Sequence, residues 1–162
     1  MKNFFSVVLL SAFLSGCLQS PLLNHAVANE GDESAEAKKG SALVFPQQEL
    51  SASITWIKEP ADEEAGSFTL RFWSTKLGTE QGPYVDPGHV VAVKLWMPSM
   101  GHGSSPVKVE QIKDQAGGAV AGVYEATDVF FSMGGKWEIW VQLKKNKADK
   151  TPVEQAKIDY SL

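Results

Sequence analysis

The chain has 162 residues, a formal net charge of -4 and 43% hydrophobic residues. Its 15 basic side chains are dispersed along the sequence, which argues against a nucleic-acid-binding protein. The length fits one globular domain, and the single cysteine excludes a disulfide within one chain.

The amino-terminal segment has the three parts of a secretory signal. Lys2 precedes an apolar run, which Leu14-Ser15-Gly16-Cys17 closes. The run is about eleven residues long, whereas a transmembrane helix needs roughly twenty. The closing tetrad resembles the bacterial lipobox, in which the cysteine is lipidated and becomes the first residue of the mature protein. We therefore predict a signal peptide over residues 1–16 and a lipid anchor at Cys17 that holds the chain on a membrane.

The alternative interpretation of this segment is an ordinary signal peptide with an incidental cysteine, or a free buried thiol at Cys17. Leu18, a non-acidic residue after the cysteine, favours anchoring of the protein on the periplasmic side of the outer membrane within the bacterial cell envelope.

Residues 17–46 are mostly small, acidic or basic, with few large apolar groups. Such a composition predicts a flexible tether that leads into a folded domain over residues 47–162.

The pattern from residue 49 onward is that of β-strands. Alternation of apolar and polar residues, separated by turns rich in Gly and Pro, predicts seven strands. They are residues 51–58, 67–75, 89–97, 107–114, 122–127, 136–144 and 155–162. Seven short strands without a helical period predict an all-β fold, an immunoglobulin-like antiparallel β-sandwich. Trp137 and Trp140 lie three apart on one strand, so we expect one in the core and the other on the surface.

The turn over residues 96–106 concentrates unusual chemistry. Met97, Met100 and His102 lie within six residues, and Met133 lies in a loop that we expect at the same end of the sandwich. Thioether and imidazole donors suit Cu(I) far better than they suit Mg²⁺ or Ca²⁺. The sequence therefore predicts a copper site formed by these four residues, with Trp96 packed beside the metal.

Each of these residues also has a structural reading. Met97 would then end a core strand, and His102 would be a hydrogen-bonded turn residue. His89, at the start of a predicted strand, is assigned a structural or exposed role. The domain has neither a catalytic triad nor a zinc motif such as His-Glu-x-x-His, so we do not expect an enzyme.

Three segments together resemble the YtkA-like and FixH-like domains of bacterial envelope proteins. They are the Met97-Pro98-Ser99-Met100-Gly101-His102 turn, the Gly122-x-Tyr124 strand, and the strand with Gly135, Trp137, Ile139 and Val141. The resemblance covers roughly residues 85–145. It implies an immunoglobulin-like envelope domain linked to copper handling, with a copper-handling or respiratory oxidase assembly protein as partner.

Two functions follow from this sequence. The first is a membrane-anchored lipoprotein that binds or delivers Cu(I) through its Met/His loop. The second is a structural or protein-binding module without metal, in which the Met-rich turn and exposed aromatic residues such as Trp73 or Trp140 form a contact surface.

Overall fold

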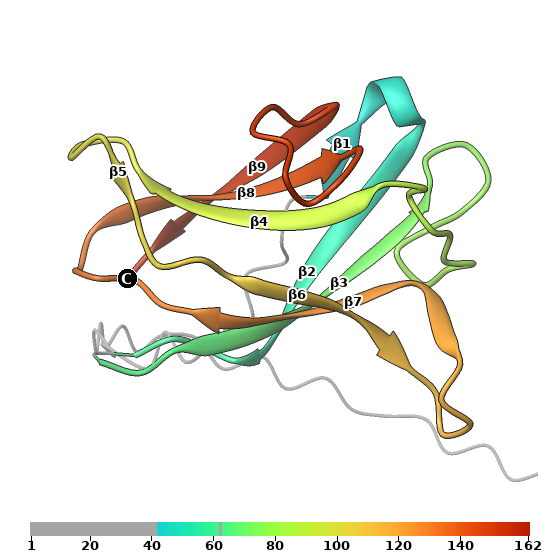
Figure 1. Ribbon diagram of the computed structural model, residues 1–162, viewed down its shortest axis with the longest axis horizontal. Helices are drawn as coiled ribbons and strands as arrows, with labels where there is room; N and C mark the ends of the chain where they lie inside the picture. The colour runs from blue at the N-terminus through green and yellow to red at the C-terminus, as the bar shows by residue number, and fades with distance from the viewer. Residues whose placement is uncertain (1–41, 62) are drawn as a thin grey trace, which may run out of the picture. The chain divides into compact units, whose positions relative to one another are not determined.

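The computed structural model describes residues 42–61 and 63–162 (Figure 1). The predicted signal peptide, the lipidated Cys17 and most of the predicted tether lie outside the described residues. No helix among the described residues is long and apolar enough to cross a membrane.

The described residues form two antiparallel sheets that face each other (Figure 1). One sheet has five strands in the order β1-β2-β3-β7-β6, and the other has four in the order β5-β4-β8-β9. The strands are β1 (Leu43–Phe45), β2 (Leu50–Lys58), β3 (Gly66–Ser74), β4 (Val90–Met97), β5 (His102–Gly103), β6 (Lys108–Lys113), β7 (Ala119–Val129), β8 (Lys136–Lys144) and β9 (Glu154–Ser161). A short 3-10 helix, η1 (Pro46–Gln48), joins β1 to β2.

The strand order confirms the immunoglobulin-like prediction. When β2, β3, β4, β6, β7, β8 and β9 are lettered A to G, the sheets read ABED and CFG, as in the constant-type immunoglobulin domain. All seven predicted strands are present, with ends that differ by a few residues from the prediction.

Two short strands were not predicted. Strand β1 lies inside the range that the sequence assigns to the tether, and it pairs with β2 from Leu43↔Ala52 to Phe45↔Leu50. Leu43 and Phe45 are buried, so the sandwich begins a few residues before the predicted boundary at residue 47. Strand β5 has two residues and pairs with the end of β4.

The core lies between the two sheets and is made by alternate residues of each strand. On β8, Trp137, Ile139, Val141 and Leu143 are buried, as the alternating pattern predicts. Trp140 points to the other face, where its indole nitrogen donates to the Glu138 carboxylate at 2.9 Å. The prediction that one of these two tryptophans is internal is therefore confirmed.

Asp86 joins the long connection between β3 and β4 to the five-stranded sheet. Its Oδ1 accepts hydrogen bonds from the Gly122 amide and from the Gln111 side chain, both at 2.7 Å. Beside it, the Val85 amide donates to the Phe72 carbonyl at 2.9 Å. A Cβ on Gly122 would lie 2.5 Å from the Val85 carbonyl oxygen, so only glycine allows this approach.

The Gly122-x-Tyr124 motif is therefore a packing device. Tyr124 packs edge-on against the Phe72 ring, with ring centres 5.8 Å apart. Its hydroxyl also lies 3.5 Å from Asp86 Oδ1. Burial, followed by the charge of Asp86, raises the pKa of Tyr124 to about 12.

The position of Trp73 differs from the expectation. We expected it on an exposed contact surface, but only 7% of it is accessible to solvent. Tyr84 forms an isolated β-bridge with Trp73, and Gly78 lies against the Trp73 Cβ. The connection between β3 and β4 therefore covers Trp73 and removes it from the candidate contact residues.

Candidate metal site

The predicted donor residues come from two neighbouring loops at one end of the sandwich. Met97 is the last residue of β4, Met100 lies in the turn, and His102 begins β5. Met133 lies in the loop between β7 and β8. Figure 1 shows the β4–β5 turn at the same end of the sandwich as this loop and the carboxyl terminus.

The turn brings Met97 and His102 directly opposite each other. They are Cα partners in the antiparallel β4–β5 pair, so both side chains lie on the same face of the sheet. The amides of Met100 and Gly101 both donate to the Met97 carbonyl, at 3.2 and 2.9 Å. Gly101 has a φ of 66°, which closes the turn and which glycine adopts without strain.

The imidazole of His102 is oriented by its own strand. Its Nδ1 lies 3.0 Å from the Gly103 carbonyl oxygen. Because a carbonyl oxygen only accepts, Nδ1 carries the proton of the neutral ring and the lone pair is on Nε2. A ligating histidine commonly has this arrangement, in which the second ring nitrogen donates to a backbone carbonyl.

Trp137 connects the turn to the loop that carries Met133. Its ring meets the His102 ring edge-on, with centres 6.1 Å apart. Its indole nitrogen donates to the Met133 carbonyl at 3.0 Å. One buried indole thus connects the His102 ring to the backbone of the loop that carries Met133. The sequence predicted that one of Trp137 and Trp140 is internal, but it assigned Trp137 no role at the metal site.

Further contacts fix the same two loops. The Ser104 hydroxyl donates to the Phe130 carbonyl, which links the segment after β5 to the segment before Met133. Gly135 lies against the Met97 side chain, because a Cβ at Gly135 would be 3.2 Å from Met97 Cε. The backbone of Gly135 and that of Leu162 exchange hydrogen bonds at 3.2 and 3.1 Å.

The three thioethers differ in their exposure. Met97 is 3% exposed and belongs to the core, so it ends a core strand as the structural alternative predicts. Met100 is 60% exposed and Met133 is 41% exposed, both in loops. The end of the sandwich thus offers one oriented imidazole, two accessible thioethers and one buried thioether beneath them.

The structure does not place the Trp96 side chain on the face that carries Met97 and His102. Adjacent residues of a strand point to opposite faces, so Trp96 lies on the outer face while Met97 points inward. There the Lys94 ammonium lies 4.1 Å from the centre of the Trp96 ring.

His89 precedes the other end of β4, and its Nδ1 donates to the Pro87 carbonyl at 2.8 Å, in agreement with a structural role.

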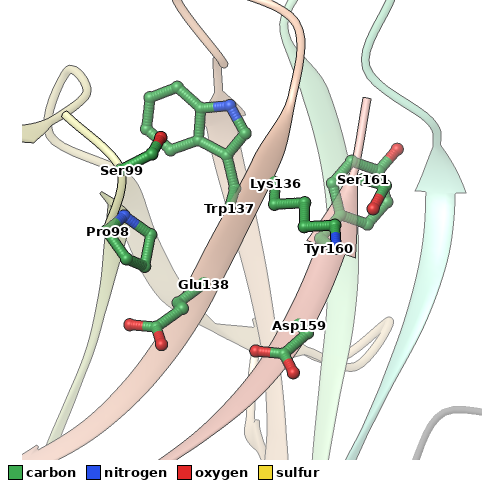
Figure 2. Close-up of a pocket in the computed structure, with 8 residues that line it drawn as sticks. All are labelled: Pro98, Ser99, Lys136, Trp137, Glu138, Asp159, Tyr160 and Ser161. Carbon is green, nitrogen blue, oxygen red and sulfur yellow. The ribbon is translucent and has the colours of Figure 1, made fainter.

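A pocket of about 390 Å³ lies beside the turn (Figure 2). It is lined by Pro98, Ser99, Lys136, Trp137, Glu138, Asp159, Tyr160 and Ser161. Glu138 and Asp159 are Cα partners, and Lys157 lies between their carboxylates. The hydrogen bond from Lys157 holds the pKa of Glu138 below its usual value, so this carboxylate is already paired.

No group of three or more His, Cys, Asp or Glu side chains within residues 42–61 and 63–162 is arranged to hold a metal ion. The candidate site depends instead on methionine sulfur. One imidazole with two or three thioethers is a soft donor set, which fits Cu(I).

These observations define an immunoglobulin-like β-sandwich domain with a Met/His-bearing end. Residues 47–142 match the YtkA-like family, which is more than half of the 162 residues, and the chain belongs to this family. The matched range includes the whole Met-Pro-x-Met-Gly-His turn and both later motifs, so the resemblance to YtkA-like domains is confirmed. No curated protein and no solved structure matches the chain.

Proposed function

We propose that the protein is a lipid-anchored envelope protein that binds Cu(I) as a cargo at the end of its sandwich. The observation that carries this proposal is the placement of the oriented His102 ring beside two loops with accessible thioethers, Met100 and Met133. The domain acts as a carrier and not as a catalyst.

In this proposal, His102 donates through Nε2, and Met100 and Met133 donate through sulfur. Met97 lies beneath the turn, where its sulfur is shielded from water and serves as the fourth donor. Exposed ligands on loops favour release of the ion, whereas a fully enclosed site favours retention. The arrangement therefore suits transfer of Cu(I) to a copper-handling or respiratory oxidase assembly protein.

Membrane attachment rests on the sequence around Cys17. A diacylated cysteine is held more firmly than a single acyl chain, because each buried methylene contributes about 0.8 kcal/mol. We propose that this anchor holds the domain on the periplasmic side of the outer membrane. Radiolabelled palmitate incorporation that persists in Cys17→Ser would overturn this part of the proposal.

The copper proposal is tested by titrating the full chain in detergent with Cu(I) and a competing chelator, under reducing conditions. We expect one tight equivalent in the parent protein and a loss of affinity of about 100-fold or more in a variant with Met100→Leu, His102→Ala and Met133→Leu. His89→Ala is the matched control, since it removes a histidine from the other end of β4. An absence of binding by the parent, or equal binding by the triple variant, refutes the proposal.

A protein-binding module without metal is the second candidate. It is favoured by Trp96 and Trp140, which both lie on the outer face of the four-stranded sheet and are only half-buried. Aromatic side chains are frequent at the centres of protein interfaces. Capture of one specific envelope protein that Trp140→Ser abolishes, with no copper in either preparation, would favour this candidate.

A further inference from the structure

The tripeptide Ser-Met-Gly occurs twice in the chain, at residues 99–101 and 132–134. Both copies lie in the loops that Trp137 joins at one end of the sandwich. Each copy exposes its methionine, with 60% of Met100 and 41% of Met133 accessible to solvent.

The glycines keep the surroundings of both methionines open. A Cβ at Gly101 would meet no atom within 4 Å, and one at Gly134 would meet only a carbonyl oxygen at 3.9 Å. Met97 is nearby in the same end of the domain but is only 3% exposed. The fold thus presents two thioethers to dissolved reagents and shields a third.

We propose that Met100 and Met133 are modification sites, oxidised to methionine sulfoxide by hypochlorous acid. The sulfur lone pair attacks chlorine and releases hydroxide, and water then adds its oxygen to the chlorosulfonium. The net step converts thioether and HOCl into sulfoxide, chloride and one proton, with two electrons passing from sulfur to chlorine. Accessibility controls which methionines react, so Met97 is spared.

Oxidation changes the chemistry of this end of the domain. A sulfoxide is polar, and its sulfur no longer offers the soft thioether lone pair that Cu(I) prefers. The consequence for copper rests on the proposed function: loss of two of the four donors releases the ion. The modification itself is independent of that function, because exposure alone selects the two residues.

The experiment treats the full chain in detergent with increasing HOCl and follows each methionine by tryptic peptide mass spectrometry. Fragment spectra separate Met97 from Met100. We expect Met100 and Met133 to be oxidised first, with Met97 at least about tenfold slower, because it must await local opening. The same treatment in urea is the control, in which all three should react at similar rates. Oxidation of Met97 in the folded chain as fast as Met100 overturns the proposal.

A second arm separates this inference from the copper proposal. The chain oxidised at Met100 and Met133 is freed of oxidant and is then titrated with Cu(I) as before. Selective oxidation that lowers the affinity for Cu(I) supports both proposals. Selective oxidation that leaves Cu(I) binding unchanged supports the modification sites and counts against the copper site.

Discussion

Among the glycines of the described residues, an added Cβ at Gly122 would have the shortest contact, and Gly122→Ala is therefore the sharpest test of the fold. An added Cβ would lie 2.5 and 2.7 Å from the Val85 oxygen and nitrogen and 2.9 Å from the Phe72 carbonyl oxygen. These are backbone atoms of two different segments, so rotation of a side chain cannot relieve the clash. The connection that carries Val85 and Asp86 must move away from the sheet.

The magnitude follows from what that movement breaks. A left-handed φ of 66° at Gly122 costs an alanine about 1–2 kcal/mol. Loss of the hydrogen bond from Gly122 to the Asp86 carboxylate adds about 1.5–3 kcal/mol, and loss of the bond from Val85 to Phe72 adds about 1 kcal/mol. The lower entropy of the unfolded alanine variant offsets part of this, by about 0.4–1 kcal/mol. Together these terms give a net destabilisation of about 2.5–5.5 kcal/mol.

Urea unfolding followed by tryptophan fluorescence measures this change. Gly88→Ala is the matched control, because Gly88 has a φ of 64° but no atom within 4 Å of its Cβ position. The control should lose only the cost of the left-handed φ, reduced by the same effect on the unfolded state, which leaves at most about 1.5 kcal/mol. Equal losses in the two variants would show that the close approach at Gly122 contributes nothing and would refute the reasoning.

Three other changes test the core, the domain entry and the buried tyrosine. Met97→Ala should destabilise the fold by about 2–5 kcal/mol in thermal unfolding, whereas Met100→Ala should change stability by less than about 0.5 kcal/mol; similar effects would contradict the burial difference. Glu154→Gln should cost about 1–2 kcal/mol, because its carboxylate accepts the amides of Gln47 and Gln48 at 3.0 and 3.1 Å; unchanged urea unfolding would count against this contact. Because the pKa of Tyr124 is raised to about 12 in the folded protein, its protonated hydroxyl contributes fully to the free energy of unfolding below pH 10, and this contribution is lost as the pH rises towards 12. The free energy of unfolding of Tyr124→Phe should therefore change less with pH than that of the parent between pH 10 and 12, and parallel curves would exclude the effect.

The sequence predicted the strands well, because alternation of apolar residues reports directly on burial at each position. Trp137 and Trp140 illustrate this, since their spacing alone placed them on opposite faces. Strand β1 was missed because three residues are too few to show a period, and it follows a segment with the composition of a tether. The strand is defined by its pairing with β2 and by its contacts with β9, and the contacts with β9 join segments that are far apart in the chain.

The candidate site was predicted only in outline. The spacing of Met97, Met100 and His102 placed them on one turn. The burial of a sulfur depends, however, on which alternate residues of β4 face the core. The same alternation places Trp96 on the outer face of the sheet, away from Met97, although we had expected it beside a metal. The role of Trp137 between the two loops depends on packing between distant segments, which composition and periodicity do not report.

The attachment of Glu154 to the backbone at Gln47 and Gln48 has a mechanical consequence. Strand β1 belongs to one sheet and Glu154 to the other, so this carboxylate ties the entry of the domain to both sheets. A pull on the chain ahead of Leu43 is therefore shared by the two sheets, and it has to overcome a charged contact as well as the short β1 ladder before the sandwich unravels.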